Sequence, residues 1–211
     1  MQTGEGFLAI WSDVPETEET NYLHWLTREH ASERVSLPGF LRMRLFRARL
    51  AEVRRYFILY HLETPSIIRS EPYLARVNAP TEWSRQIMPL LKNFIRGGGQ
   101  RMTFGLGGGA IVAPIQFDRP EMPLFRSAAK KIGALDRIVS TALLETDEIA
   151  SAIPSREKSL RQPDQSFAAL LIIEALDDLA LDVAIDELRK TEYSGVQITR
   201  YEQIFGLDKA G

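Results

Sequence analysis

The order in which apolar strands and helices follow one another constrains the fold of this chain more than any single motif does. In the first half, the spacing of apolar residues predicts strand, helix, strand, strand, helix, strand, and the second half repeats this order with almost no residue identity. The strands are predicted at 6–12, 40–48, 55–62, 101–106, 110–117, 136–144, 167–175 and 196–205, and the helices at 17–38, between the prolines at 72, 80 and 89, at 123–135 and at 176–191.

This order also predicts how the chain buries its sheets. A split β-α-β unit has helices on one face of its sheet and a bare apolar face on the other, and the bare face must be covered. When one chain contains two such units, the bare face of each sheet can pack against the bare face of the other. We therefore expect a closed or nearly closed barrel with a cavity inside.

Composition excludes several classes of function. The 211 residues are 45% hydrophobic and 26% charged, enough for a full core in one large or two small domains, of which we favour two. The net charge of −2 gives no field that would gather nucleic acid, although arginine is locally dense between 42 and 55. Cysteine is absent, which excludes disulfides, thiolate metal sites and a cysteine nucleophile.

The N-terminal stretch and the longest apolar run indicate whether the chain could be secreted or could span a membrane. The N-terminus reaches its first apolar run without a basic leader and meets Asp13 soon afterwards, so we interpret it as a strand and not a signal peptide. The longest apolar run elsewhere, at 167–173, is too short to cross a bilayer. We expect a soluble cytoplasmic protein with no membrane or nucleic-acid partner.

Histidine titrates near neutral pH, and the chain contains only His24, His30 and His61. His24 and His30 are six residues apart, about 240° around a helix at 100° per residue, so they cannot share a metal ion. The HExxH and facial-triad spacings are absent. We expect no metal site.

His30 lies on the apolar stripe of the first helix, after Leu23 and Leu26 and one turn before Arg34. One interpretation is a half-buried histidine that bonds to a backbone carbonyl or to charged neighbours. The other is a histidine that lines a ligand cavity and acts as a general base. The spacing alone leaves both interpretations open.

A longer pattern in the first half supports a family resemblance. It consists of His24-Trp25, Glu29-His30, Glu33-Arg34 and Leu37-Pro38-Gly39-Phe40, followed by an arginine-rich strand and the segment 70–87. Over roughly residues 6–105 the chain resembles the dimeric α+β barrel superfamily. Within it, the chain most resembles the EthD-like proteins, whose first helix carries tryptophan and Glu-His and ends in Pro-Gly-Phe.

The resemblance implies ferredoxin-like domains that pair through their sheets, that allow a homodimer, and that often bind small, frequently aromatic molecules. With the order of elements, it predicts an α+β fold of two tandem ferredoxin-like (βαββαβ) domains, at 1–106 and 107–211, packed sheet to sheet as an intrachain pseudo-dimeric α+β barrel. It places the helix histidine of the family at His30 and the neighbouring acid at Glu29, the expected catalytic residues. The second half lacks the pattern at 123–135, so we expect one such pocket per chain.

Six further residues are candidates for substrate binding, and each also has a structural interpretation. Aromatic residues at these spacings more often form core, a histidine between apolar strand neighbours fills a sheet face, and an asparagine before a helix caps it. The candidates are Tyr22, Trp25, His61, Tyr73, Asn78 and Trp83.

Arginine and glycine clusters support weaker hypotheses. The arginines between 42 and 55 could recognise a carboxylate, but a solvated strand face is the simpler interpretation. Glycine runs at 97–99 and 107–109 indicate a hinge or a close backbone approach, and they match no nucleotide-binding pattern.

We therefore expect a small-molecule-binding protein that does acid/base chemistry on a small hydrophobic or aromatic substrate in the barrel cavity. His30 would act as general base, with no metal and no organic cofactor. A noncatalytic structural or oligomerisation module and a cofactor-free monooxygenase are the alternatives. A sealed interior would favour the module, and an open pocket beside His30 would favour the enzyme.

Overall fold

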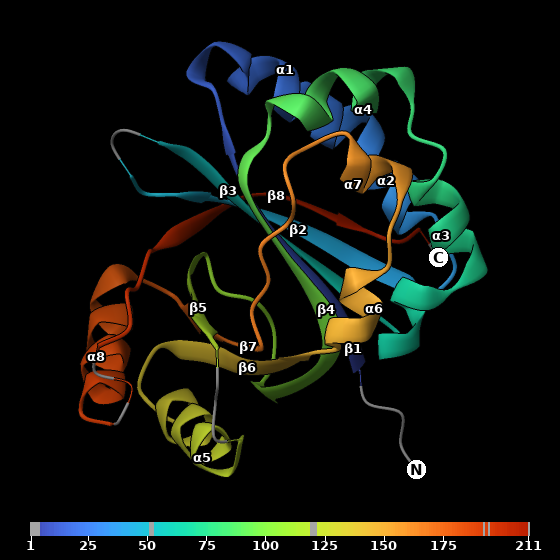
Figure 1. Cartoon of the computed structure of the whole chain (residues 1–211). Coiled ribbons are helices and arrows are strands. Elements are labelled where there is room, and N and C mark those ends of the chain that lie inside the picture. The colour runs from blue at the N-terminus through green and yellow to red at the C-terminus, as the bar shows by residue number, and fades with distance from the viewer. Residues whose placement is uncertain (1–4, 51–52, 119–121, 192, 194, 211) are drawn as a thin grey trace.

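Eight strands form a closed antiparallel barrel in the computed structural model, which describes residues 5–50, 53–118, 122–191, 193 and 195–210 (Figure 1). Around the barrel they follow the order β1-β3-β2-β8-β5-β7-β6-β4. Their bounds are β1 (Glu5–Val14), β2 (Phe40–Ala48), β3 (Arg54–Leu62), β4 (Lys92–Gly105), β5 (Ile111–Phe117), β6 (Ile138–Thr146), β7 (Ala169–Ala175) and β8 (Tyr201–Asp208).

The helices lie on the outside of the barrel (Figure 1). Their bounds are η1 (Glu16–Glu18), α1 (Glu19–Trp25), η2 (Leu26–His30), α2 (Ala31–Val35), η3 (Pro65–Arg69), α3 (Glu71–Val77), α4 (Glu82–Ile87), η4 (Met88–Leu90), α5 (Met122–Gly133), α6 (Glu148–Ala152), α7 (Arg156–Ser159) and α8 (Asp178–Arg189). No helix within the described residues combines the length and apolar character needed to cross a membrane.

Each half of the barrel has the strand order of a ferredoxin-like unit, β4-β1-β3-β2 in the first half and β8-β5-β7-β6 in the second. Two seams join the halves, one between β2 and β8 and one between β4 and β6. This topology confirms the predicted fold class, a pseudo-dimeric α+β barrel. The division into domains at residue 106 stays a prediction.

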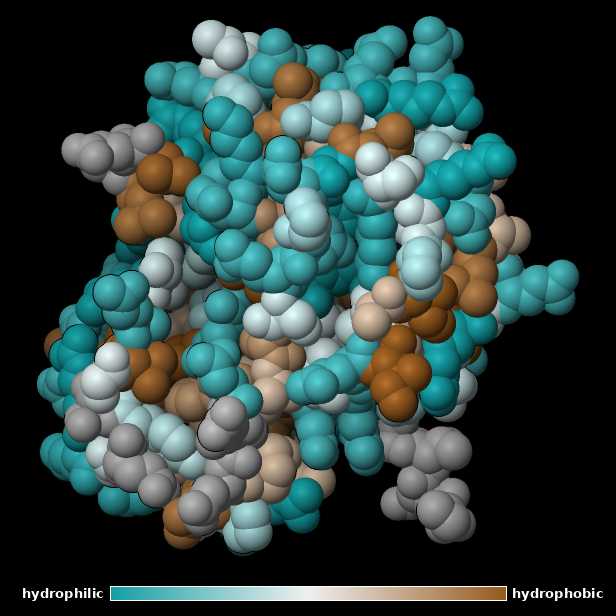
Figure 2. All heavy atoms as spheres, in the orientation of Figure 1, coloured by the Kyte–Doolittle hydropathy of each residue, from teal (hydrophilic) through white to brown (hydrophobic). Residues whose placement is uncertain are grey.

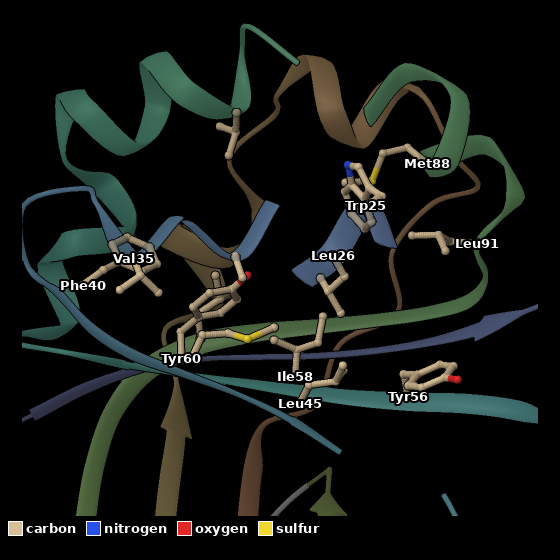
Figure 3. Packing of buried hydrophobic residues seen from close by; sticks show 14 of the residues in the cluster. Trp25, Leu26, Val35, Phe40, Leu45, Tyr56, Ile58, Tyr60, Met88 and Leu91 are labelled. Carbon is tan, nitrogen blue, oxygen red and sulfur yellow. The ribbon is translucent and has the colours of Figure 1, made fainter. Parts of the chain in front are cut away.

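Alternate residues of each strand point into the barrel and out toward the helices, because successive side chains of a strand lie on opposite faces. In β1, Leu8 packs in the helix-covered layer, whereas Phe7 and Trp11 lie inside the barrel. Figure 3 shows the helix-covered layer of the first half, where Trp25 from the helix side and Ile58 from the sheet belong to one buried cluster.

Side chains fill the interior of the barrel. Trp11 stacks on Phe57 with ring centroids 4.5 Å apart and meets Phe167 edge-on at 5.5 Å. Phe7 and Phe46 are fully buried in the same cluster. The expectation of a cavity inside the barrel is therefore wrong, because aromatic side chains from both halves occupy that space.

The glycine runs mark close approaches of the chain. A Cβ on Gly99 would lie 2.1 Å from a backbone carbonyl oxygen of β6, across the seam between the halves. A Cβ on Gly108 would lie 2.8 Å from the guanidinium of Arg44, which pairs inside the barrel with Glu174 at 2.8 Å. The predicted start of the fourth strand at 101 is also wrong, since 97–99 continue β4.

The connection between β6 and β7 crosses from the second half onto the helices of the first. In Figure 1 its two helices, α6 and α7, lie near α2 and α3. The backbone N–H of Arg156 donates to Asn78 Oδ1 at 3.0 Å, and Gln165 bridges to Ile95 of β4. The polar loop predicted at 155–165 therefore contains a helix and forms part of the first half's outer layer.

Candidate functional site beside His30

The first helix contains a wider turn at the position of His30. α1 ends at Trp25, the π-helical turn η2 follows, and α2 begins after His30. On a regular α-helix the side chains of Trp25 and His30 would point about 140° apart, at 100° per residue. Here the two ring centroids are 4.3 Å apart, with the rings tilted by 35°. π turns within α-helices are frequent at functional sites.

A small chamber lies between this helix and the outer face of the first-half sheet. Its volume is about 40 Å³, which is room for water but less than a ring-sized ligand needs. Aromatic and charged side chains form much of its wall, among them Tyr22, Trp25, His30, Arg34, Tyr60 and Tyr73.

Four polar atoms of residues that line this chamber have no hydrogen-bond partner among the described residues: His30 Nδ1, Arg34 Nη1 and the hydroxyls of Tyr22 and Tyr60. His30 and Arg34 are only 5% and 3% exposed, and each of the two tyrosines is 1% exposed. Buried polar groups of native proteins are nearly always bonded, so unpartnered ones require an explanation. Water molecules or polar groups of a ligand in the chamber would supply the missing partners.

Burial and neighbouring cations favour the neutral form of His30. Burial is the main cause that lowers the pKa of His30 well below 6.5, and the charges of Arg34, Arg161 and Arg76 lower it further. Burial also raises the pKa of Tyr60 above 10, with the charge of Arg34 opposing it. At neutral pH the chamber therefore contains an uncharged imidazole and a protonated phenol.

Residues from the second half close the chamber. Arg34 Nη2 donates to Glu157 of α7, and the two side chains are 3% and 10% exposed. The guanidinium carbon of Arg161 lies 3.7 Å from the ring centroid of Phe94, and Arg161 pairs with Asp164 at 2.9 Å. The site is therefore built from both halves of the chain.

Glu29, which the resemblance places beside His30 as a catalytic acid, does not line the chamber. Its carboxylate accepts a hydrogen bond of 2.6 Å from the Thr81 hydroxyl, which lies 3.0 Å from the Ser84 hydroxyl. Ser84 in turn accepts a hydrogen bond of 3.1 Å from the indole N–H of Trp25. Glu29 thus supports the tryptophan that packs on His30 and lies outside the space where a ligand would react.

Three other candidates lie away from the chamber. His61 shares the inner face of β3 with Leu59, and its Nδ1 is 2.8 Å from Arg101 Nη1. Burial, followed by the charge of Arg101, lowers the pKa of His61 to about 2. Asn78 is exposed and accepts from α7, and Trp83 donates to an asparagine of α1 at 3.0 Å. The candidates that the structure does bring together are Tyr22, Trp25, His30 and Tyr73.

Sequence reasoning missed three residues of this site, Arg34, Tyr60 and Glu157. Strand parity could have found Tyr60, because Tyr56 and Tyr60 share the face that meets the helices. Nothing in the sequence pairs Arg34 with Glu157, which lies 123 residues later.

The donor set of the chamber suits an organic ligand. Within the described part of the chain, no three histidine, aspartate or glutamate side chains come close enough together to hold a metal ion. A guanidinium N–H, a phenol and a neutral imidazole are instead groups that can bond to the oxygen of a carbonyl or hydroxyl.

No protein-family model matches this sequence, and no curated protein sequence matches it. Solved structures do match, over nearly the whole chain. A candidate monooxygenase from Fusobacterium nucleatum subsp. nucleatum has a TM-score of 0.60 at 10% identity, covering 100% of this chain and 97% of its own. An anthrone oxidase-like protein has a TM-score of 0.59 at 6% identity, covering 100% of this chain and 95% of its own.

A chlorite dismutase from Candidatus Nitrospira defluvii, in complex with imidazole, has a TM-score of 0.53 at 11% identity and covers 96% of this chain and 92% of its own. At such low identity these matches carry information on the fold alone. This chain therefore shares their fold, the α+β barrel described above, over nearly its whole length.

Proposed function

We propose that this chain binds a small hydrophobic molecule with a carbonyl or hydroxyl oxygen in the His30 chamber and moves a proton on it. The proposal rests on one observation: four residues with buried unpartnered polar atoms, Tyr22, His30, Arg34 and Tyr60, line one aromatic-walled space. Perturbed titratable groups in a cavity are typical of reactive sites.

His30 has the general base role in this proposal. Its neutral imidazole takes a proton from an acidic C–H or O–H of the ligand, so that the ligand oxygen gains negative charge. Arg34 and Tyr60 donate hydrogen bonds to that oxygen, in a buried place where such bonds are strong. Since burial and Arg34 disfavour the imidazolium, His30 returns the proton readily, which suits isomerisation.

The size of the chamber sets a condition on binding. A ring-sized substrate needs more than the volume of about 40 Å³, so side chains of the wall must move when it enters. Met88 and Leu91 line the chamber opposite the sheet, and methionine is the most adaptable apolar side chain. The names of the neighbours, monooxygenases and an anthrone oxidase-like protein, support a small aromatic ligand. A cofactor-free monooxygenase is the alternative reaction at the same chamber.

A noncatalytic module is the second candidate function, and the filled barrel interior favours it. In that case the unpartnered atoms of the chamber bond only to water. The two candidates differ in whether His30 exchanges protons with any bound molecule.

Proton exchange tests the first candidate directly. We expect the protein, incubated in D₂O with a panel of small aromatic ketones and phenols, to accelerate deuterium incorporation at an acidic carbon, as read by NMR. His30→Gln should lower this rate by about 10²–10⁴-fold, the usual contribution of a general base. His24→Gln is the matched control, because His24 is near the protein surface and contacts Arg28. Exchange that is equal in both variants would contradict the role of His30, and oxygen uptake would identify an oxygenase.

A further inference from the structure

A second and much larger cavity opens beside the chamber. It is a groove of about 810 Å³ between α6, α7, the segment 163–168 and the first part of β4, a volume typical of small-molecule sites. Figure 2 shows the face that carries α7 as largely hydrophilic. The groove is lined by Arg96, Ser151, Ser155, Lys158, Gln165 and Phe167, among others.

Arg96 connects this groove to the chamber of His30. It lines the groove, the chamber and a small cavity of about 30 Å³ between them. Lys158 lines the groove and the small cavity. The two cations therefore lie where the groove meets the small cavity.

Four cations cluster in this region, but only two have a carboxylate. Arg34 pairs with Glu157, and Arg161 pairs with Asp164. Among the described residues, Arg96 and Lys158 form no ion pair, although Arg96 is only 8% exposed. Arginine is seldom buried without a counter-charge in contact. Asp118, Glu148 and Asp164 also line the groove, but none of their carboxylates contacts Arg96 or Lys158.

Neutral oxygens alone hold these two cations. Arg96 donates to the carbonyl of Ser151 at 3.0 Å and to the hydroxyl of Tyr73 at 2.9 Å. Lys158 Nζ donates to the same Ser151 carbonyl at 2.5 Å and to the carbonyl of Ile153 at 2.8 Å. One backbone oxygen thus binds two cations, which repel each other. An anion beside them would relieve the repulsion and supply the missing counter-charge.

We propose that this groove binds a small organic monocarboxylate, with its carboxylate between Arg96 and Lys158. Apolar residues of the groove, Ala152, Pro154, Pro163, Phe167 and Ala168, receive the body of the ligand. The exposed carboxylates of Asp118 and Glu148 at the groove disfavour ligands with several negative charges. This proposal goes beyond the His30 chemistry and does not depend on it.

Binding should depend on pH because one of the two cations titrates. The pKa of Lys158 is lowered to about 8, chiefly by burial and then by the charges of Arg96 and Arg161, while the charge of Asp164 opposes this shift. The carboxylate binds the protonated lysine, so affinity is full below the pKa of about 8 and falls as the pH rises through it. Bound carboxylate must in turn raise the pKa of Lys158.

Calorimetry with matched ligands tests the proposal. Straight-chain and phenyl-substituted monocarboxylates are titrated into the full chain at neutral pH beside their primary amides. We expect the acids to bind and the amides to fail. Lys158→Met, which keeps the aliphatic stem, should weaken acid binding by about tenfold or more, the loss of one charge-assisted contact. Lys130→Met is the matched control, because Lys130 is exposed on α5 in the second half.

Further variants keep the test decisive. Lys158→Arg keeps the charge and should keep most of the affinity, and thermal unfolding of each variant verifies that it is folded. Three results would overturn the proposal. The acids and the amides could bind equally well, Lys158→Met could keep the affinity of the original chain, or NMR could show that no acid of the panel raises the pKa of Lys158. His30→Gln should bind the acids normally, which separates the failure of this proposal from that of the His30 chemistry.

Discussion

Tyr60 and Tyr56 lie on the same face of β3, yet their hydroxyls have different surroundings. The Tyr60 hydroxyl is buried without a partner among the described residues, whereas the Tyr56 hydroxyl donates to Glu19. A buried polar group without a partner costs free energy, and a bonded one does not. Tyr60 is therefore a residue whose hydroxyl is better explained by ligand binding than by folding.

Replacing these two tyrosines with phenylalanine should have opposite effects on stability. Without ligand, Tyr60→Phe should leave the free energy of unfolding unchanged or raise it by up to about 1–2 kcal/mol, because it removes an unpartnered hydroxyl. Tyr56→Phe should lower it by about 1–3 kcal/mol, because Glu19 Oε1 loses its donor while Oε2 keeps the hydrogen bond of 3.1 Å from Arg54. Urea unfolding measures both. A loss of stability in Tyr60→Phe as large as in Tyr56→Phe would show that the Tyr60 hydroxyl has a structural partner.

At the scale of elements, β4 is the strand that binds the halves together. Its first part pairs with β1 and bridges to Gln165, and its second part pairs with β6 of the other half. The glycines at 97–99 lie where β4 passes from one neighbour to the next, and the missing side chains let these neighbours approach. The seam should therefore be sensitive to one added methyl group.

Gly99→Ala should lower the free energy of unfolding by about 1–3 kcal/mol or more, the usual cost of overpacking. The added Cβ would meet a carbonyl oxygen of Glu145 at 2.1 Å, and backbone cannot move aside as a flexible side chain can. Gly195→Ala is the matched control, since nothing lies within 4 Å of its Cβ position. Chemical denaturation measures the difference, and equal stability of the two variants would contradict the close contact at this seam.

The elements that sequence patterns predicted best are strands with clear boundaries in the sequence. β2, β3 and β5 begin and end within one residue of the prediction, because each is a run of strand length, rich in apolar residues, between turn-forming or charged residues. The start of β4 was missed, since glycines carry no such pattern, and α7 was missed because it is one turn of polar residues. The sequence carries no signal for the wide turn at His30, which brings the rings of Trp25 and His30 to a centroid distance of 4.3 Å.

At the scale of the whole molecule, closure of the barrel was predictable but its filling was not. The order of elements indicated two sheets with bare faces, and these faces do meet. Whether they enclose a hollow depends on side-chain volumes from distant segments, and here Trp11, Phe57 and Phe167 occupy the space. The candidate site was predicted in the barrel interior, but it lies in the outer layer, where Glu157 from the second half completes it.

The first half, expressed alone, should therefore not form a soluble monomer. Residues 1–106 alone would expose Phe7, Trp11, Phe46 and Phe57, which the intact chain buries in the barrel, and an apolar face of this size drives association. We expect dimers or aggregates in analytical ultracentrifugation, while the full chain sediments without such aggregation. A folded, monodisperse monomer of the fragment would contradict the view that each half needs the other to cover its sheet.

Phe167 belongs to two surfaces at once, because it lines the groove and also packs edge-on against Trp11 inside the barrel. A molecule seated in the groove consequently presses on an aromatic ring that reaches an indole at the centre of the protein. Ligand binding in the groove should therefore change the surroundings of the Trp11 indole, and the fluorescence emission of Trp11 should report whether the groove is occupied.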